Sequence, residues 1–139
     1  MENTDIIEKF KKNNIRITPQ RLEAYNIINR ENKHMSVEEI YKEMIKVSPS
    51  VSLATVYSIL SVLSKEKLIN EIRIDFDKSY FDARVDEHHH FLCRRCGRII
   101  DVDIPFCPTL KRKRYGNNLI ESFQGYFYGI CEECRSKDK

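Results

Sequence analysis

The sequence predicts an α+β fold with two parts. A helical N-terminal part ends in a β-hairpin, and a small C-terminal α/β part surrounds four cysteines. Three observations support this. Apolar residues recur at helical spacing as far as Leu63, alternation replaces that spacing over residues 69–82, and two Cys-x-x-Cys pairs lie in the remainder. We therefore expect two domains, residues 1–82 and 83–139.

The first two helices show both an apolar face and defined ends. Apolar residues within 6–10 share one face, and the asparagine pair at 13–14 ends that helix. Thr18 then provides an N-cap and Pro19 a first helical residue, the positions that each residue type favours. The buried stripe of the second helix is expected at Leu22, Tyr25 and Ile28.

Two further helices follow. Ser36 and Glu39 have the spacing of a capping box, which begins a third helix through Met44. Pro49 interrupts the chain, and Ser52 can cap a longer fourth helix. The buried face of this helix is predicted at Val56, Ile59, Leu60 and Leu63.

A hairpin is predicted after the helices. Residues 69–76 alternate through Ile72, Ile74 and Phe76, residues 75–78 can turn, and residues 79–82 can return as a second strand. Helices followed by such a hairpin have the plan of a winged helix, whose last helix would enter the DNA major groove. The candidate DNA contacts on it are Ser52, Thr55, Tyr57 and Ser58. The alternative is an ordinary helical domain in which Tyr57 is a packing or surface residue.

Charge does not by itself predict nucleic-acid binding. The net charge is +3, with 13 basic and 13 acidic residues in 1–82 and 11 and 8 in 83–139. No apolar run approaches the roughly 20 residues of a membrane span, and no secretory signal is visible at the N-terminus. We therefore expect a cytoplasmic protein, in which paired cysteines favour metal over disulfides.

The cysteine pairs predict a structural zinc site. Cys93 and Cys96 form one pair, Cys131 and Cys134 form the other, and 34 residues separate them. Gly97 allows a tight turn after the first pair. A redox dithiol is the alternative, and Cys107 is expected to be an unpaired residue. Strands are predicted around 91–92, 99–100 and within 119–130, with a helix containing the basic residues 111–114.

Histidines before the first pair indicate a second metal site. In a strand, His88 and His90 share a face and His89 points away. If residues of both halves approach them, three imidazoles and two carboxylates would suit Fe(II) or Mn(II), although zinc is also possible. Such a metal would fix the two halves relative to each other. The candidate ligands are His34, Asp82, His88, His90 and Asp101.

In five stretches of its sequence the chain resembles the Fur (ferric uptake regulator) family of bacterial metalloregulators. The matching residues lie at 17–21, 52–57, 88–97, 101–102 and 128–134, in the family's order along the chain. The resemblance implies a homodimer with N-terminal winged-helix DNA-binding domains and C-terminal dimerisation and metal-binding domains. It also implies a four-cysteine zinc, and metal-dependent repression at AT-rich inverted repeats. Arg21, in the first matching stretch, is a further candidate DNA contact.

Aspartate at both Asp82 and Asp101 resembles the peroxide-sensing PerR branch of that family. The resemblance implies that iron and peroxide oxidise His34 or His88, which weakens the site and releases DNA, whereas Mn(II) supports repression without oxidation. The alternative within the family is an iron- or manganese-responsive repressor. Many members of the family have a further metal site that uses the histidine matching His89 and a second histidine near the last strand. Gln124 stands in place of that second histidine, so we do not expect the further site here.

Two other functional classes compete with a repressor. A non-haem iron oxygenase needs two histidines, one carboxylate and open coordination positions, and five candidate ligands leave little room for a substrate. A zinc-ribbon interaction module would have no second metal, so replacing His88 and His90 would not change its function. We therefore expect a regulator and no enzymatic activity. Lys67 stands where a helix-ending glycine is usual, which predicts a left-handed residue there.

Overall fold

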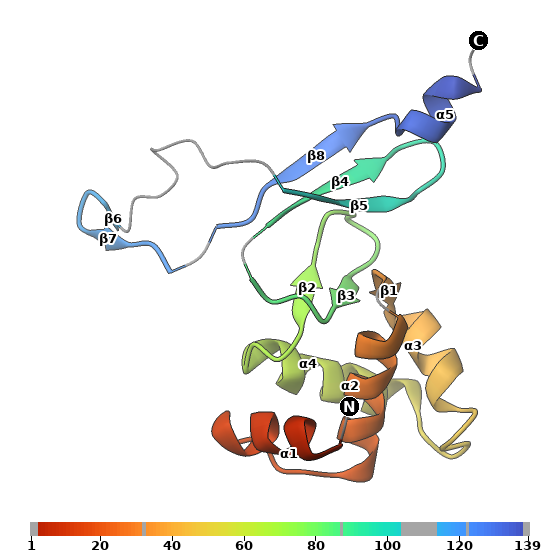
Figure 1. Cartoon of the computed structure of the whole chain (residues 1–139), viewed down its shortest axis with the longest axis vertical. Helices are drawn as coiled ribbons and strands as arrows, with labels where there is room; N and C mark the ends of the chain where they lie inside the picture. Colours follow the sequence, from red (N-terminus) through yellow and green to blue (C-terminus); the bar gives the residue numbers. More distant parts are fainter. Residues whose placement is uncertain (1–2, 32, 87, 104–113, 122, 138–139) are drawn as a thin grey trace. The chain divides into compact units, whose positions relative to one another are not determined.

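The structure is a computed structural model, and it describes residues 3–31, 33–86, 88–103, 114–121 and 123–137. The chain forms two compact units, Met1–Val85 and Asp86–Lys139. Each unit is described by itself. Helices and sheets are both present, which confirms the α+β class (Figure 1). No helix among the described residues is long and apolar enough to cross a membrane.

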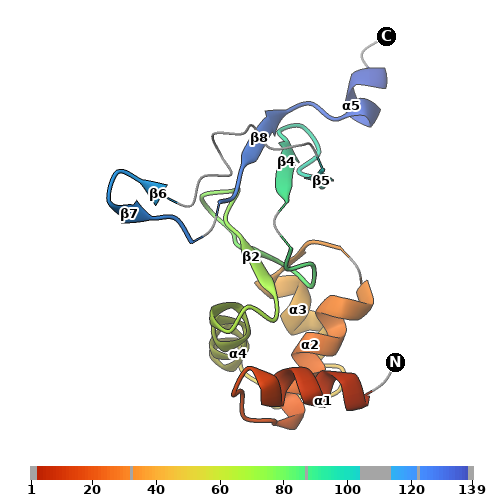
Figure 2. The ribbon, with the colours of Figure 1, turned by 60° about the vertical axis from the view of Figure 1, so that its left-hand side comes forward.

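Four helices build the first unit around one apolar core. They are α1 (Asn3–Lys12), α2 (Pro19–Glu31), α3 (Val37–Met44) and α4 (Leu53–Lys65). α4 is seen from the side in Figure 1 and nearly end-on in Figure 2. The stripes predicted on α2 and α4 face inward, with Ile28, Leu60 and Leu63 almost inaccessible to solvent. Helical periodicity therefore located the core of this unit.

The predicted helix starts are present. The Ser36 hydroxyl accepts a hydrogen bond from the Glu39 backbone N–H, and the Glu39 carboxylate accepts one from the Ser36 N–H, which completes the capping box of α3. Ser52 caps α4 by accepting from the Thr55 N–H at 3.1 Å. These bonds satisfy backbone donors that a helix start otherwise leaves without partners.

A three-stranded sheet, in the order β1-β3-β2, completes the first unit. Its strands are β1 (Met35–Ser36), β2 (Asn70–Ile72) and β3 (Tyr80–Asp82). β2 is shorter than the predicted strand over 69–76, because the chain bends after Ile72 into a loop over residues 73–79, here called the wing loop. Ile74 is buried, as alternation predicts, whereas Phe76 is fully exposed.

The second unit is a sheet followed by a short helix. Its strands, in the order β5-β4-β8, are β4 (His89–Cys93), β5 (Ile99–Val102) and β8 (Tyr126–Gly129), and α5 (Glu132–Ser136) follows β8. β4 runs antiparallel to β5 and parallel to β8. A separate two-stranded ladder joins β6 (Arg114–Tyr115) to β7 (Asn118–Leu119). These strands confirm the predicted sheet character of the C-terminal part.

Some expectations fall on residues that the structure does not describe. Cys107 and most of the basic run at 111–114 lie outside the described residues. Arg114 is described, and it lies in β6 rather than in the predicted helix. Strands β6 and β7 form a short hairpin with a two-residue turn. This turn contains Gly116 at φ +59°, a conformation that glycine adopts readily.

Candidate functional site

The four paired cysteines come together at one end of the second unit. Cys93 ends β4, Cys96 lies in the turn that follows, Cys131 is the residue before α5, and Cys134 lies within α5. The Cys93 and Cys134 sulfurs are 3.8 Å apart, as are those of Cys96 and Cys131. Thiolates about 2.3 Å from a tetrahedral zinc stand about 3.8 Å from one another. The cluster therefore has the dimensions of a structural zinc site.

Backbone pairing positions both knuckles. Cys93 lies opposite Gly129 in the β4–β8 ladder, so the chain after β8 begins beside the first pair. The Arg94 N–H donates to the Gly129 carbonyl at 2.8 Å and extends this register past the strand. Gly97, at φ +77°, then reverses the chain. The parallel pairing of β4 and β8 is what brings two distant sequence pairs to one place.

Within the cluster, the pKa values of Cys93 and Cys134 are shifted in opposite directions. The backbone N–H groups of Cys96 and Cys131 point at the Cys93 sulfur, at 3.5 and 3.4 Å, and lower the pKa of Cys93 to about 6. Hydrogen bonding with the Cys131 thiol, together with burial, raises the pKa of Cys134 to about 12. N–H donors aimed at sulfur favour the thiolate, which is the form that binds zinc.

A second group of donors comprises His88, which directly precedes β4, His90 on β4 and Asp101 on β5. Asp101 pairs with His90 in the antiparallel register, and its Oδ1 atom is 3.1 Å from His88 Nε2 and 3.5 Å from His90 Nε2. The two imidazole rings lie with centroids 4.4 Å apart. Both histidines are buried. The alternation argued from the sequence thus places His88 and His90 on one side of β4.

Two polar contacts orient the ring of His88. Its Nδ1 atom is 2.8 Å from the Asp86 carbonyl, which can only accept, so Nδ1 carries the proton. In the neutral ring, Nε2 then presents a lone pair to the Asp101 carboxylate at 3.1 Å. Second-partner bonds of this kind are typical of metal-binding histidines.

The remaining two candidate ligands lie together in the first unit. His34 precedes β1 and Asp82 ends β3, and the register that pairs Met35 with Phe81 sets His34 opposite Asp82. His34 Nε2 is 3.5 Å from Asp82 Oδ2, and both side chains are largely shielded from solvent. The other carboxylate oxygen, Oδ1, accepts from the Arg84 N–H. Each unit therefore carries its own histidine–aspartate pairing, with donors suited to iron, manganese or zinc.

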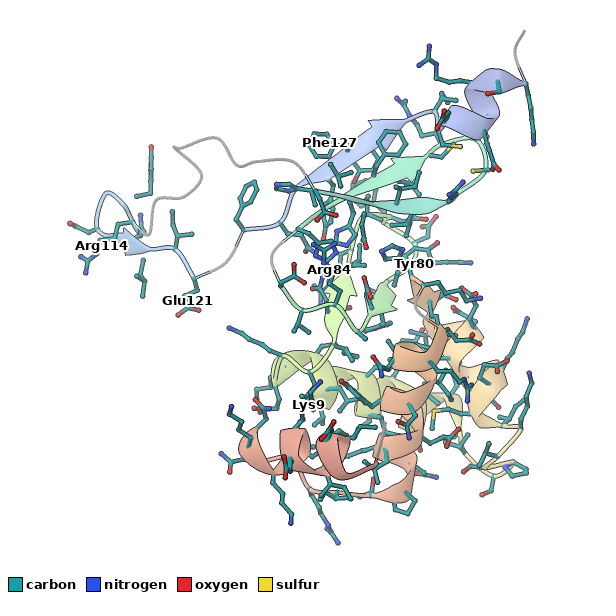
Figure 3. All side chains as sticks on the ribbon, in the orientation of Figure 1. Lys9, Tyr80, Arg84, Arg114, Glu121 and Phe127 are labelled. Atoms are coloured by element: carbon teal, nitrogen blue, oxygen red, sulfur yellow. The ribbon has the colours of Figure 1, made fainter. Side chains whose placement is uncertain are left out.

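His89 points away from these donors into an aromatic seat. Its ring meets Phe123 and Phe127 edge-on, at centroid distances of 5.4 and 5.9 Å; Phe127 is labelled on β8 in Figure 3. A Cβ atom added to Gly125 would overlap the His89 ring, so this close approach requires glycine. Gln124 accepts a hydrogen bond from the Tyr126 hydroxyl at 2.6 Å. Sequence reasoning missed this aromatic seat.

The exposed face of α4 carries the candidate DNA contacts. Tyr57 is about half exposed and Ser58 is exposed, whereas Val56, Ile59 and Leu60 face the core. Ser52 and Thr55 are partly engaged in capping, because their hydroxyl oxygens lie 2.8 Å apart. Arg21 donates from Nη1 to the Arg16 carbonyl at 3.0 Å, a contact that sequence reasoning did not anticipate. Arg21 therefore anchors the loop before α2.

Residues 12–123 of the chain match the Ferric uptake regulator family. The Peroxide operon regulator of Bacillus subtilis is 29% identical over 136 residues, which cover 96% of this chain and 94% of that protein.

Solved structures agree with this match. The Campylobacter jejuni peroxide stress regulator is 31% identical with a TM-score of 0.68, and the comparison covers 96% of this chain and all of that one (100%). The Helicobacter pylori ferric uptake regulator, whose structure is described as revealing three functional metal-binding sites, is 27% identical with a TM-score of 0.72, over 95% and 90% of the two chains.

Proposed function

The chain belongs to the Ferric uptake regulator family of metal-responsive transcription regulators, and from that premise we propose that it is a PerR-like repressor that senses peroxide. Regulators of this family bind DNA and act as dimers. Its cofactors are a structural Zn(II) in the four-cysteine cluster and a regulatory Fe(II) or Mn(II) in the His/Asp donor set. The proposal extends to a homodimer that recognises an AT-rich inverted repeat.

In this proposal the first unit binds DNA through α4. Tyr57 and Ser58 are exposed where a helix in the major groove would meet base edges. Ser52 lies at the N-terminus of α4, where backbone N–H groups and the helix dipole favour a phosphate. Arg21 would add a charged contact to the backbone of the duplex. The second unit would form the dimer and hold the zinc.

The regulatory metal would take ligands from both units. His34 and Asp82 offer two donors, and the group around Asp101 offers three. Neither group alone fills the coordination shell of Fe(II) or Mn(II), which commonly bind five or six N/O ligands, whereas together they approach it. A metal shared in this way would hold the DNA-binding units of a dimer in one arrangement, so metal occupancy would control DNA affinity.

The single observation that carries the proposal is the thiolate-free cluster of His88, His90 and Asp101, with His88 held by the Asp86 carbonyl. Fe(II), when bound there, supplies one-electron reduction of peroxide next to the imidazoles. His34 and His88 are the candidate oxidisable ligands. An oxygen atom added to either ring would weaken its donor nitrogen, lower metal affinity and so release DNA. Mn(II) would support repression without this damage.

Peptide mass spectrometry tests the proposal. The protein is loaded with Zn(II) and Fe(II), treated briefly with dilute hydrogen peroxide, and digested, in parallel with a Mn(II)-loaded sample. We expect one added oxygen on the peptides that contain His34 or His88 in the iron sample only. His89, buried against aromatic rings and turned away from Asp101, is the internal control and should stay unmodified.

An alternative function is reversible repression by iron or manganese, and the same donor set is compatible with it. Intact histidines after peroxide treatment, with iron verified in the protein and DNA binding still metal-dependent, would favour this alternative. If His88→Ala and Asp101→Ala both retain metal-dependent DNA binding, both functions are contradicted. Circular dichroism on the two variants separates loss of metal from loss of fold.

A further inference from the structure

The wing loop presents an unusual aromatic side chain. Phe76 has a relative exposure of 107%, the highest of the exposed large apolar residues in the part of the chain that the structure describes. Its neighbours in sequence, Asp75 and Asp77, are polar, whereas Ile72 before the loop and Ile74 within it are buried. The Phe76 ring is therefore available to contact a partner, and removing it from water in such a contact would be favourable.

The loop holds Phe76 in place. The Asp75 side chain accepts a hydrogen bond from the Asp77 N–H at 3.0 Å, a local turn that fixes the residue between them. Below the tip, Glu71 on β2 accepts from the Ser79 hydroxyl at 2.8 Å and so links the two sides of the loop. An aromatic side chain on an ordered support loses little conformational freedom when it binds.

Phe76 and Tyr57 line the same cavity of about 470 Å³. The cavity separates the exposed face of α4 from the wing loop, and its charged lining comprises Arg73, Lys78, Glu38, Glu71, Asp75 and Asp77. If α4 lies in a major groove, the element beside it faces the next sugar–phosphate strand and the minor groove beyond it. Phe76 then lies across the cavity from α4, on the side of that minor groove.

We propose that Phe76 is a minor-groove wedge, which inserts between two base pairs beside the segment read by α4. This inference rests on the proposed function, because it requires α4 to bind the duplex. A single aromatic between carboxylates does not form the broad apolar patch that a protein partner would need. Isolated apolar side chains that enter the minor groove and partly unstack a base step are, in contrast, an established mode of DNA recognition.

The charges at the tip predict selectivity rather than strong binding. Asp75 and Asp77 repel phosphates, and Arg73 is partly neutralised by Glu71, whose Oε1 atom lies 3.2 Å from Arg73 Nη2. Phe76 would therefore enter only where a base step opens easily. Pyrimidine–purine steps, TA above all, are the easiest to unstack. Phe76 would thus help to select an AT-rich site that contains a TA step at the wing position.

Fluorescence measurements on DNA test this inference. The probes are a duplex selected by the wild-type, Zn(II)- and Mn(II)-loaded dimer from a random library, and copies with 2-aminopurine placed singly along the outer part of each half-site. We expect 2-aminopurine fluorescence to rise at one step with wild type and with Phe76→Leu, and not with Phe76→Ala. Replacing a TA step there by AA should cost wild type roughly 10-fold in affinity and Phe76→Ala much less.

Val47→Ala is the matched control, since Val47 is also exposed in the first unit and does not line the cavity. It should behave as wild type in both assays. Equal affinity, step preference and fluorescence for wild type and Phe76→Ala would overturn the wedge while leaving the proposed function in place. Failure of the wild-type dimer to bind any duplex would remove the proposed function, and the wedge with it. Loss of dimerisation by Phe76→Ala, seen by sedimentation, would assign Phe76 to a protein interface instead.

Discussion

Two residues end helices of the first unit in the left-handed conformation, Asn14 at φ 57° and Lys67 at φ 60°. After α4, the Leu68 N–H donates to the Leu63 carbonyl at 2.9 Å and the Lys67 N–H donates to that of Ser64 at 3.0 Å. The same pair of bonds follows α1, and together they form the Schellman motif. Asparagine tolerates this conformation, whereas lysine has a Cβ clash and no compensating local hydrogen bond.

Lys67→Gly should therefore stabilise the protein. Relief of a left-handed penalty of roughly 1–2 kcal/mol, less the added freedom of glycine in the unfolded chain, leaves a gain of about 0.5–1 kcal/mol. Urea unfolding of the zinc-loaded protein, followed by far-UV circular dichroism, measures it. Asn14→Gly is the matched control and should gain less. A Lys67→Gly protein that is less stable than wild type would contradict the assignment of left-handed strain.

The length of the side chain at Asp101 is expected to affect peroxide sensitivity. Asp101→Glu keeps a carboxylate beside His88 and His90 but moves its oxygens by one methylene. We expect Mn(II)-dependent DNA binding to persist, and the half-time of peroxide inactivation of the Fe(II) form to lengthen several-fold. DNA-binding titrations after timed peroxide exposure provide the measurement. Unchanged peroxide sensitivity would show that the carboxylate length does not determine the subtype.

At the scale of elements, the parallel pairing of β4 with β8 organises the second unit. It sets Cys93 beside the segment that leads to α5, and it seats His89 against Gly125. Gly125 also accepts the His90 N–H hydrogen bond at 3.1 Å, so one residue fixes the backbone next to a candidate ligand. The side of β4 that carries the candidate ligand His90 thus depends on packing at its opposite side.

Gly125→Ala should disturb this pairing. The new methyl group would overlap the imidazole of His89, which is buried between two phenylalanines and has little room to move, so we expect a loss of about 1–3 kcal/mol. Thermal unfolding of the zinc-loaded protein measures the change. Gly129→Ala, at the end of β8, is the control, because its Cβ would lie 3.2 Å from the Phe91 ring and require only a small shift. Equal effects of the two changes would refute the proposed clash.

At the scale of the whole molecule, the two units differ in what stabilises them. The first has a continuous apolar core that draws on all four helices. In the second, the buried cluster consists of Cys93, Cys131 and Cys134, with partly buried apolar residues around them. Because buried thiols replace a larger apolar core there, zinc is expected to supply much of the folding free energy, of order 10 kcal/mol for structural sites.

Zinc removal should consequently unfold the second unit alone. Chelation, or Cys96→Ser, should abolish the near-UV signal of the aromatic residues on β8 and dissociate the dimer while most helical far-UV signal remains. The first unit holds four of the five described helices, which explains the remaining signal. Metal analysis and sedimentation complete the measurement. A zinc-free protein that stays folded and dimeric would contradict this assignment.

The affinity for zinc should fall as the pH falls. Binding requires thiolates, and the pKa of Cys93 in the metal-free cluster is lowered to about 6 by backbone N–H donors. Above that pH, Cys93 is already ionised, and zinc displaces a proton from Cys134, whose pKa is raised to about 12. Below it, Cys93 also takes up a proton, so the affinity should decline more steeply with each pH unit. Competition with a chelator between pH 5 and pH 8 checks the slope.

The sequence by itself determined the features that local chemistry controls. The capping box at Ser36, the cap at Ser52 and the left-handed Lys67 are each specified by neighbours within a few residues. The two-residue gap within each cysteine pair and the alternation across residues 88–90 depend equally on local geometry, and the structure shows the imidazoles of His88 and His90 close together. Such features need no knowledge of distant contacts.

Only the tertiary structure decided what depends on residues far apart in sequence. It ended β2 at Ile72 and left Phe76 exposed, where alternation alone extended a strand. It seated His89 against Gly125, and it turned Arg21 toward the Arg16 carbonyl. In each case the outcome depends on which partner the fold brings within contact distance. A period-two or period-3.6 pattern records the side of an element that is buried, and it does not record the partner that buries it.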